Sequence, residues 1–418
     1  LRAVNFIEAI SYVKNKGLSP DRLRDEKLER YNSSERSVIA DVWPAYEEKL
    51  ELHNILDYDN LLIKGAELFA LPLFAESFAT VLVDSFHNTT ALEYKVAKAL
   101  ATHSQSITIV GSPDLSIFDW KSANDGQFEE LIEDFGTHRT MKLEQNYTTS
   151  QSIVAFGNKL IKQDKSRISK TLFSQAPRGL PVVLHHAADE TEEARFIART
   201  IDSLREQLDG IVDYQDFAVL VKLNYMLKPI EAALREAEIP FSDEVGSNAV
   251  MVSTIHSAAS LSLAVVFIPG VEKGIFPHSS AMNYDEERRI LFVAMSSSRT
   301  HCVLSYAETR EGSTGRSSSK SLSPFIYPIS RLSRLPAITD SMRRDVATVL
   351  GKEWRPRPDE VEEEKVKVED EKAVPAQSPL HPQAIPTTPK HERETNRPST
   401  PQRKRVKRAV EDSPTPRS

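Results

Sequence analysis

The chain has 418 residues, of which 40% are hydrophobic and 27% are charged, so it is long enough for two or three domains with buried cores. No run of eighteen or more apolar residues predicts a transmembrane helix, and the single cysteine, Cys302, excludes an internal disulfide framework or a cysteine-based zinc cluster. The net charge of −7 gives no support for nucleic-acid binding, so any such function must depend on a local surface.

The first eighty residues have the apolar periodicity of helices. An amphipathic pattern covers residues 3–16, and Gly17 follows it as a stop signal. Ser19 and Pro20 predict the cap and the first position of the next helix. A longer helical pattern covers residues 37–70.

From residue 80 onward, short apolar runs alternate with helical segments. Buried strands that alternate with helices indicate parallel sheets of the α/β class. The predicted strands are residues 80–83, 107–110, 182–184, 217–221, 250–254, 265–268 and 303–304, and the predicted helices between them include 190–207 and 227–237.

The segment from Arg355 onward differs in composition from the rest of the chain. It holds 11 of the 24 prolines, with no glycine and no aromatic residue, so it cannot bury enough apolar surface to offset chain entropy and is expected to be disordered. A compact basic cluster near its end predicts nuclear import, with nonspecific phosphate binding as the alternative. The cluster consists of Arg403, Lys404, Arg405, Lys407 and Arg408.

Six short segments, in a fixed order, carry the functional signal. They are 56–62 (LDYDNLL), 81–89 (VLVDSFHNT), 110–120 (VGSPDLSIFDW), 143–148 (LEQNYT), 252–262 (VSTIHSAASLS) and 286–298 (EERRILFVAMSSS). Through them the chain resembles the UvrD/PcrA/Rep-type superfamily 1A DNA helicases over roughly residues 3–329. The predicted nuclear tail favours the eukaryotic, fungal-type anti-recombination branch of that family.

The resemblance implies two RecA-like parallel-sheet domains of the P-loop NTPase type. Residues 1–148 would form a partial first domain with a helical remnant, 149–335 the second domain, and 336–418 a disordered nuclear tail. The family's accessory insertion is absent, because only residues 242–249 occupy its place. The phosphate-cradle motif G-x-x-x-x-G-K-[S/T] does not occur, since the chain starts beyond its position, and the first domain is therefore expected to be incomplete.

The resemblance also implies ATP and Mg²⁺ as cofactors and single-stranded DNA as a partner. Asp84 stands at the magnesium position, with a capping or turn carboxylate as the structural alternative. Gln145 and Tyr147 match nucleotide-binding positions. The positions that match DNA contacts are Phe118, Trp120, Lys121, Thr254 and His256. Core packing is the alternative for both aromatic residues, and a hydrogen-bonded strand end is the alternative for His256.

Four interior substitutions remove groups that hydrolysis of ATP needs. Ser85 replaces the glutamate that would polarise water, and Leu115 replaces the glutamine that senses the γ-phosphate. Thr148 and Ser297 replace two arginines, and a register shift could restore one cation through Arg299. A missing acid–base group costs ~10²–10⁴ in rate, and a missing arginine finger costs ~10³–10⁵.

These losses predict a catalytically defective pseudo-helicase that binds DNA or protein in DNA repair or recombination. The expected protein partners are recombination or replication proteins, and no membrane association is expected. One alternative is a weakly active 3′–5′ ATP-dependent helicase, completed by a missing N-terminal cradle segment. Another is a decayed paralogue without a function. The interior substitutions favour the first reading, because truncation of an active enzyme would not explain them.

Overall fold

The computed structural model describes ten segments of the chain, all of which lie in the unit Leu1–Pro356. For description we call residues 3–148 the N-terminal half and residues 149–354 the C-terminal half. The domain boundary between residues 148 and 149 stays a prediction. The described segments are residues 3–28, 30–75, 78–118, 127–136, 139–164, 167–244, 246–281, 283–312, 315–329 and 337–354.

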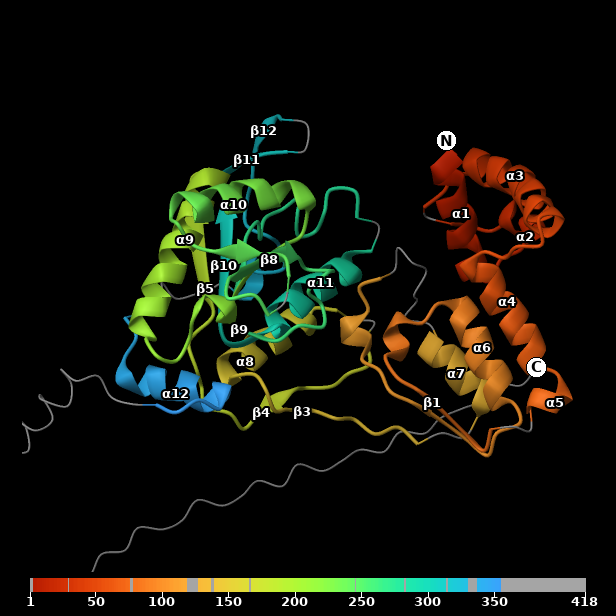
Figure 1. The fold of residues 1–418 in the computed structure, drawn as a ribbon, viewed down its shortest axis with the longest axis horizontal. Helices are drawn as coiled ribbons and strands as arrows, with labels where there is room; N and C mark the ends of the chain where they lie inside the picture. The colour runs from red at the N-terminus through yellow and green to blue at the C-terminus, as the bar shows by residue number, and fades with distance from the viewer. Residues whose placement is uncertain are drawn as a thin grey trace, which may run out of the picture. The chain divides into compact units, whose positions relative to one another are not determined.

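Helices make up the beginning of the chain, as predicted (Figure 1). The pattern over residues 37–70 is two helices rather than one, because Asn54 adopts a left-handed φ of 52° and Asp57 caps a new helix by accepting a hydrogen bond from the Asn60 N–H. A small core that includes Ile10, Ile39 and Trp43 holds the first three of the five helices together. Their bounds are α1 (Ala3–Asn15), α2 (Pro20–Leu23), α3 (Ser33–Leu52), α4 (Tyr58–Phe69) and α5 (Pro72–Ala75).

A two-stranded parallel sheet follows, formed by β1 (Thr80–Val83) and β2 (Ser106–Ile109). The helix α6 (Ala91–Ala101) connects the strands and packs on β1, and α7 (Gln127–Phe135) follows β2. The side chain of Leu82 is 74% exposed, which is unusual for a strand of a parallel sheet. The incompleteness of the first RecA-like domain stays a prediction.

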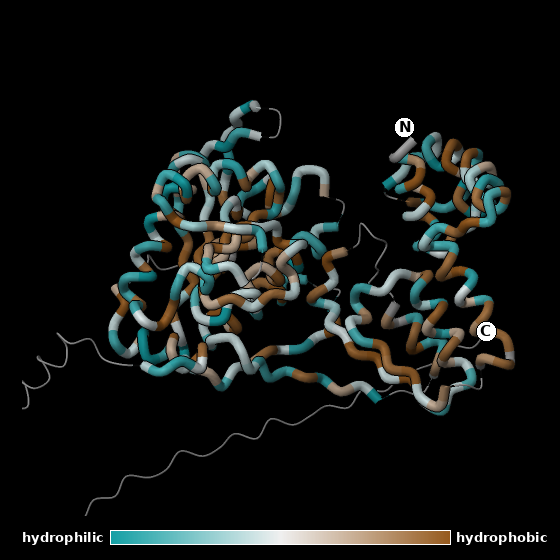
Figure 2. Tube along the Cα trace, viewed as in Figure 1, coloured by the Kyte–Doolittle hydropathy of each residue, from teal (hydrophilic) through white to brown (hydrophobic). Residues whose placement is uncertain are grey.

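The C-terminal half is built on a six-stranded, entirely parallel sheet with strand order β5-β10-β9-β6-β8-β7. Helices α9 and α10 contact each other and the sheet, as do α8 and α11, and hydrophobic residues gather at the sheet's centre (Figure 2). The predicted α/β fold is therefore confirmed. The elements are α8 (Gln151–Ile161), β5 (Val183–Ala187), α9 (Glu190–Gln207), β6 (Phe217–Val221), α10 (Leu227–Glu236), β7 (Phe241–Ser242), β8 (Val250–Thr254), β9 (Leu263–Ile268), α11 (Tyr284–Ser296) and β10 (Ser298–Ala307).

Smaller elements complete the unit. The strands β3 (Gln145–Asn146) and β4 (Phe173–Ser174) pair in parallel, and β11 (Thr309–Glu311) and β12 (Ser317–Ser319) form a hairpin. Seven residues, 243–249, join β7 to β8, which is too short for an accessory domain. Among the described residues, no helix has the length and apolar character needed to cross a membrane.

One predicted boundary is wrong. The segment 336–418 was expected to be a disordered tail, but α12 (Asp340–Leu350) packs into the core of the C-terminal half through Val346 and Ala347. Thr339 caps its start, and Gly351 ends it with a left-handed φ of 67°. The basic cluster Arg403, Lys404, Arg405, Lys407 and Arg408 lies outside the described residues.

Candidate nucleotide and DNA site

Asp84 and Ser85 lie at the carboxyl end of β1, and both are exposed. The Asp84 Oδ1 atom accepts a 2.7 Å hydrogen bond from the backbone N–H of Ser85, which adopts a left-handed φ of 53°. The carboxylate therefore stabilises the turn after the strand, as the structural alternative proposed. Within the described segments, no group of three or more His, Cys, Asp or Glu side chains is arranged to hold a metal ion.

Leu115 ends the 3₁₀ turn η2 (Pro113–Leu115) and packs, partly buried, against the hydrophobic core of the C-terminal half. An alkyl side chain offers a phosphate oxygen neither a hydrogen bond nor a charge. The position that matches the γ-phosphate sensor therefore serves packing in this chain.

The two positions that match arginines have different environments. Ser297 is 4% exposed, and its hydroxyl donates a 3.1 Å hydrogen bond to the carbonyl of Val293. Thr148 is exposed, and its N–H donates to Asn146 Oδ1 at 3.0 Å. The candidate replacement cation, Arg299, donates from Nη2 to the carbonyl of Val349 in α12 at 2.7 Å. Ser297 and Thr148 therefore supply no positive charge, and the guanidinium of Arg299 bonds α12.

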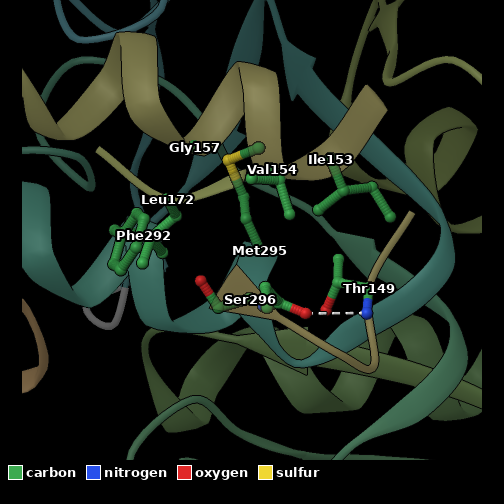
Figure 3. A pocket seen from close by; sticks show the side chains of 9 residues that line it. Thr149, Ile153, Val154, Gly157, Leu172, Phe292, Met295 and Ser296 are labelled. Carbon is green, nitrogen blue, oxygen red and sulfur yellow. Dashed lines mark hydrogen bonds between the residues drawn. The ribbon is translucent and has the colours of Figure 1, made fainter. Parts of the chain in front are cut away.

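A cavity of about 20 Å³ lies next to Thr149 (Figure 3). At one side of the cavity, the Thr149 N–H donates a 2.9 Å hydrogen bond to Asn146 Oδ1. Its volume accommodates about one water molecule, far less than a nucleotide requires. The cavity is lined by Asn146, Thr149, Ile153, Val154, Gly157, Leu172, Phe292, Met295 and Ser296.

Gln145 and Tyr147, the predicted nucleotide contacts, flank Asn146. Gln145 is half-buried in β3, where it is the register partner of Phe173. Tyr147 is 79% exposed. The Tyr147 ring is thus accessible to a planar ligand.

Two of the predicted DNA contacts come together from different halves of the chain. The rings of Phe118 and His256 have centroids 6.0 Å apart and are tilted by 58°. Thr254 ends β8, and its hydroxyl lies 2.9 Å from that of Ser257. Burial, together with the nearby positive charge of Lys222, lowers the pKa of His256 below its ordinary 6.5, which favours the neutral ring. Trp120 and Lys121 lie outside the described residues.

Sequence reasoning missed three cationic side chains that contact the loop leading to Phe118. The Arg167 guanidinium donates two 2.7 Å hydrogen bonds to the carboxylate of Asp114, and Lys170 Nζ lies 3.3 Å from the same carboxylate. Arg289, which is 2% exposed, donates from Nε to the carbonyl of Ser116 at 2.7 Å. Asp114 and Arg289 lie inside the quoted motif segments, but no spacing rule connects them to partners so distant in the chain.

Comparison with known families agrees with this architecture. The UvrD/REP helicase N-terminal domain matches residues 1–136, and the UvrD-like helicase C-terminal domain matches residues 141–246 and 242–309. The N-terminal part of the chain is therefore similar to one domain of the UvrD-type helicases and the following part to the other.

Individual relatives are bacterial. DNA helicase II of Haemophilus influenzae is 31% identical over 239 residues, which cover 56% of this chain and 32% of that protein. The ATP-dependent DNA helicase PcrA of Leuconostoc citreum is 32% identical over 238 residues, covering 56% of this chain and 31% of that protein. The chain thus spans about a third of the length of the curated relatives it matches.

A solved structure also aligns with part of the chain. It is the C-terminal domain of a possible DNA helicase from Lactobacillus plantarum, which is 17% identical and aligns over 45% of this chain and 94% of that one, with a TM-score of 0.29.

Proposed function

We propose that this protein is a UvrD-like helicase relative that binds single-stranded DNA in repair or recombination and does not turn over ATP. The observation that carries the proposal is that the substituted side chains make structural contacts within the protein. Leu115 is packed against a hydrophobic core, and the Ser297 hydroxyl is committed to a helix carbonyl. Neither position retains a group that could stabilise charge on a transferring phosphoryl group.

DNA binding is supported by the pair of rings at Phe118 and His256. Aromatic side chains that stack on bases contribute ~1–3 kcal/mol per base without sequence preference. Two relatives with similar sequences are described as DNA helicases, which is consistent with this class of ligand.

Two measurements on one sample test the proposal: ATP hydrolysis with and without single-stranded DNA, and binding of a fluorescent oligothymidine by anisotropy. We expect binding without DNA-stimulated turnover, and we expect Phe118→Ala to weaken binding by ~1–3 kcal/mol. Turnover that Asp84→Ala abolishes would instead support an active ATP-dependent helicase, for which 3′–5′ polarity is the family expectation. A chain with neither property would fit a decayed paralogue.

We further propose that the protein enters the nucleus through its C-terminal basic cluster and belongs to the fungal-type anti-recombination branch. The sequence of that cluster is the support for import. A fluorescent fusion of the full chain should accumulate in nuclei, and replacing Lys404 and Arg405 by alanine should disperse it. Equal distribution of the two fusions would contradict the proposal.

A further inference from the structure

The loop formed by residues 112–118, here called the junction loop, belongs to the N-terminal half and packs against the C-terminal half. Its Asp114 is 2% exposed, and the bidentate pair with Arg167 is buried on both sides, with side-chain exposures of 3% and 7%. Lys170 adds a 2.5 Å hydrogen bond to the hydroxyl of Ser112. A planar guanidinium that meets a carboxylate through two parallel hydrogen bonds fixes both orientation and distance.

A second contact fixes the other end of the junction loop. Arg289 of α11 donates to the carbonyl of Ser116, and Ile117 next to it is 1% exposed within the core of the C-terminal half. Leu115 and Phe118 pack against the same core. The loop is therefore held to the C-terminal half by charge at one end and by apolar burial at the other.

The junction loop is also tied to His87, in the 3₁₀ turn (Phe86–Asn88) that follows β1 and Asp84. The Ser112 N–H donates to His87 Nδ1 at 3.3 Å, and the Ser116 hydroxyl donates to the carbonyl of His87 at 3.1 Å. A loop anchored to both halves sets where Phe118 stands relative to His256. None of these anchors involves a group that a nucleotide would supply.

We propose that Asp114, Arg167 and Arg289 are positioning residues that hold Phe118 beside His256 without nucleotide, so that single-stranded DNA binds equally well with and without ATP. This inference rests on the proposed DNA-binding function. Because Leu115 is apolar, its side chain cannot form a polar contact with a phosphate. The buried pair of Asp114 and Arg167 instead fixes the junction loop whether or not a nucleotide is bound. Positioning is thereby built into the fold.

The test compares the full chain with Asp114→Asn, Arg167→Ala and Arg167→Lys, and uses Lys98→Ala as the control. Lys98 pairs with Asp134 at 2.5 Å, and its side chain is 45% exposed. Two properties are measured: hydrogen exchange of the junction loop without DNA, and the Kd for oligothymidine with and without Mg²⁺ and a non-hydrolysable ATP analogue.

We expect the native chain and Lys98→Ala to show slow exchange and a Kd that the nucleotide leaves unchanged. Asp114→Asn and Arg167→Ala should exchange at least about tenfold faster and bind DNA roughly tenfold more weakly, with partial rescue by Arg167→Lys. A nucleotide-dependent Kd or exchange rate in the native chain overturns the proposal, as does native DNA affinity in a variant whose loop exchanges fast. A native chain with a slowly exchanging loop but no DNA binding would refute the proposed function and leave the anchoring of the loop established.

Discussion

The ammonium group of Lys14 lies 2.7 Å from Oδ2 of Asp57, 43 residues further along the chain. Lys14 belongs to α1 and Asp57 caps α4, so the contact joins the first and the last long helix of the N-terminal bundle. The same ammonium reaches Glu47 at 2.7 Å and Asn60 Oδ1 at 2.9 Å, and Lys14 is only 2% exposed. A small bundle of this kind has few apolar residues to hold it, so this polar network is important for its stability.

Replacement of Lys14 by alanine should therefore destabilise the bundle. Breaking a buried ion pair costs roughly 3–5 kcal/mol, and we expect a loss of about 2–3 kcal/mol, because Asp57 and Glu47 keep some access to water. Lys64→Ala breaks an exposed pair with Glu67 and should change the free energy of unfolding by less than about 1 kcal/mol. Urea unfolding followed by circular dichroism measures both, and equal effects of the two substitutions would contradict the expectation.

The same contact makes the bundle sensitive to acid. Burial by itself would raise the pKa of Asp57, but hydrogen bonds from Lys14 and the Asn60 N–H outweigh it and lower the pKa below the ordinary 3.8. A carboxyl group whose pKa is lower in the folded state contributes stability above its unfolded pKa and loses it as the pH falls through the folded pKa. Below about pH 4, the free energy of unfolding should therefore fall more steeply with decreasing pH in the native chain than in Lys14→Ala. Urea unfolding midpoints measured across this pH range would show the difference.

Much of the C-terminal half could be predicted from the sequence. The bounds of β6, β8 and α9 match the predicted ranges, because continuous apolar runs mark buried parallel strands and the amphipathic period marks the helix. The strand β10 is longer than predicted. A search for apolar runs missed its beginning, because Thr300 and His301 are polar residues that are fully buried. The Thr300 hydroxyl donates to the carbonyl of Ala264 on the neighbouring strand, and such pairing exists only after folding.

The candidate site was less predictable. Family resemblance selected Phe118 and His256, and the structure brings their rings together, but their roles stay predictions. The pairing of Asp114 with Arg167 spans 53 residues and depends on how the two halves pack, which no local pattern encodes. The environment of Ser297 likewise depends on the burial of the end of α11 rather than on the residue type.

Ser297 is buried and Thr148 is exposed, so restoring an arginine at these two positions should have different effects on stability. Ser297→Arg would place a guanidinium where the present side chain is 4% exposed, with a cost of about 2–4 kcal/mol for an unpaired buried charge and overpacking. Thr148→Arg adds the same side chain to an exposed position and should change stability by less than about 0.5 kcal/mol. Thermal unfolding of the two variants decides the matter. A stable Ser297→Arg protein with ATPase activity would mean that the nucleotide site can be recovered by one substitution.

The two sheets should also differ in resistance to protease. Among the described strands, β1 pairs with β2 alone, so the two-stranded sheet has unpaired backbone groups along its outer edges, and Leu82 on β1 is largely exposed. In the C-terminal sheet, β6 lies between two partners, and all five of its residues are fully buried. Local opening therefore costs less free energy around Asp84, and a protease should cut residues 78–112 before residues 181–306. Mass spectrometry of a limited digest would identify the first cuts. Equal survival of the two regions would mean that the short sheet is as stable as the complete one, and that the open edges of β1 and β2 carry no energetic cost.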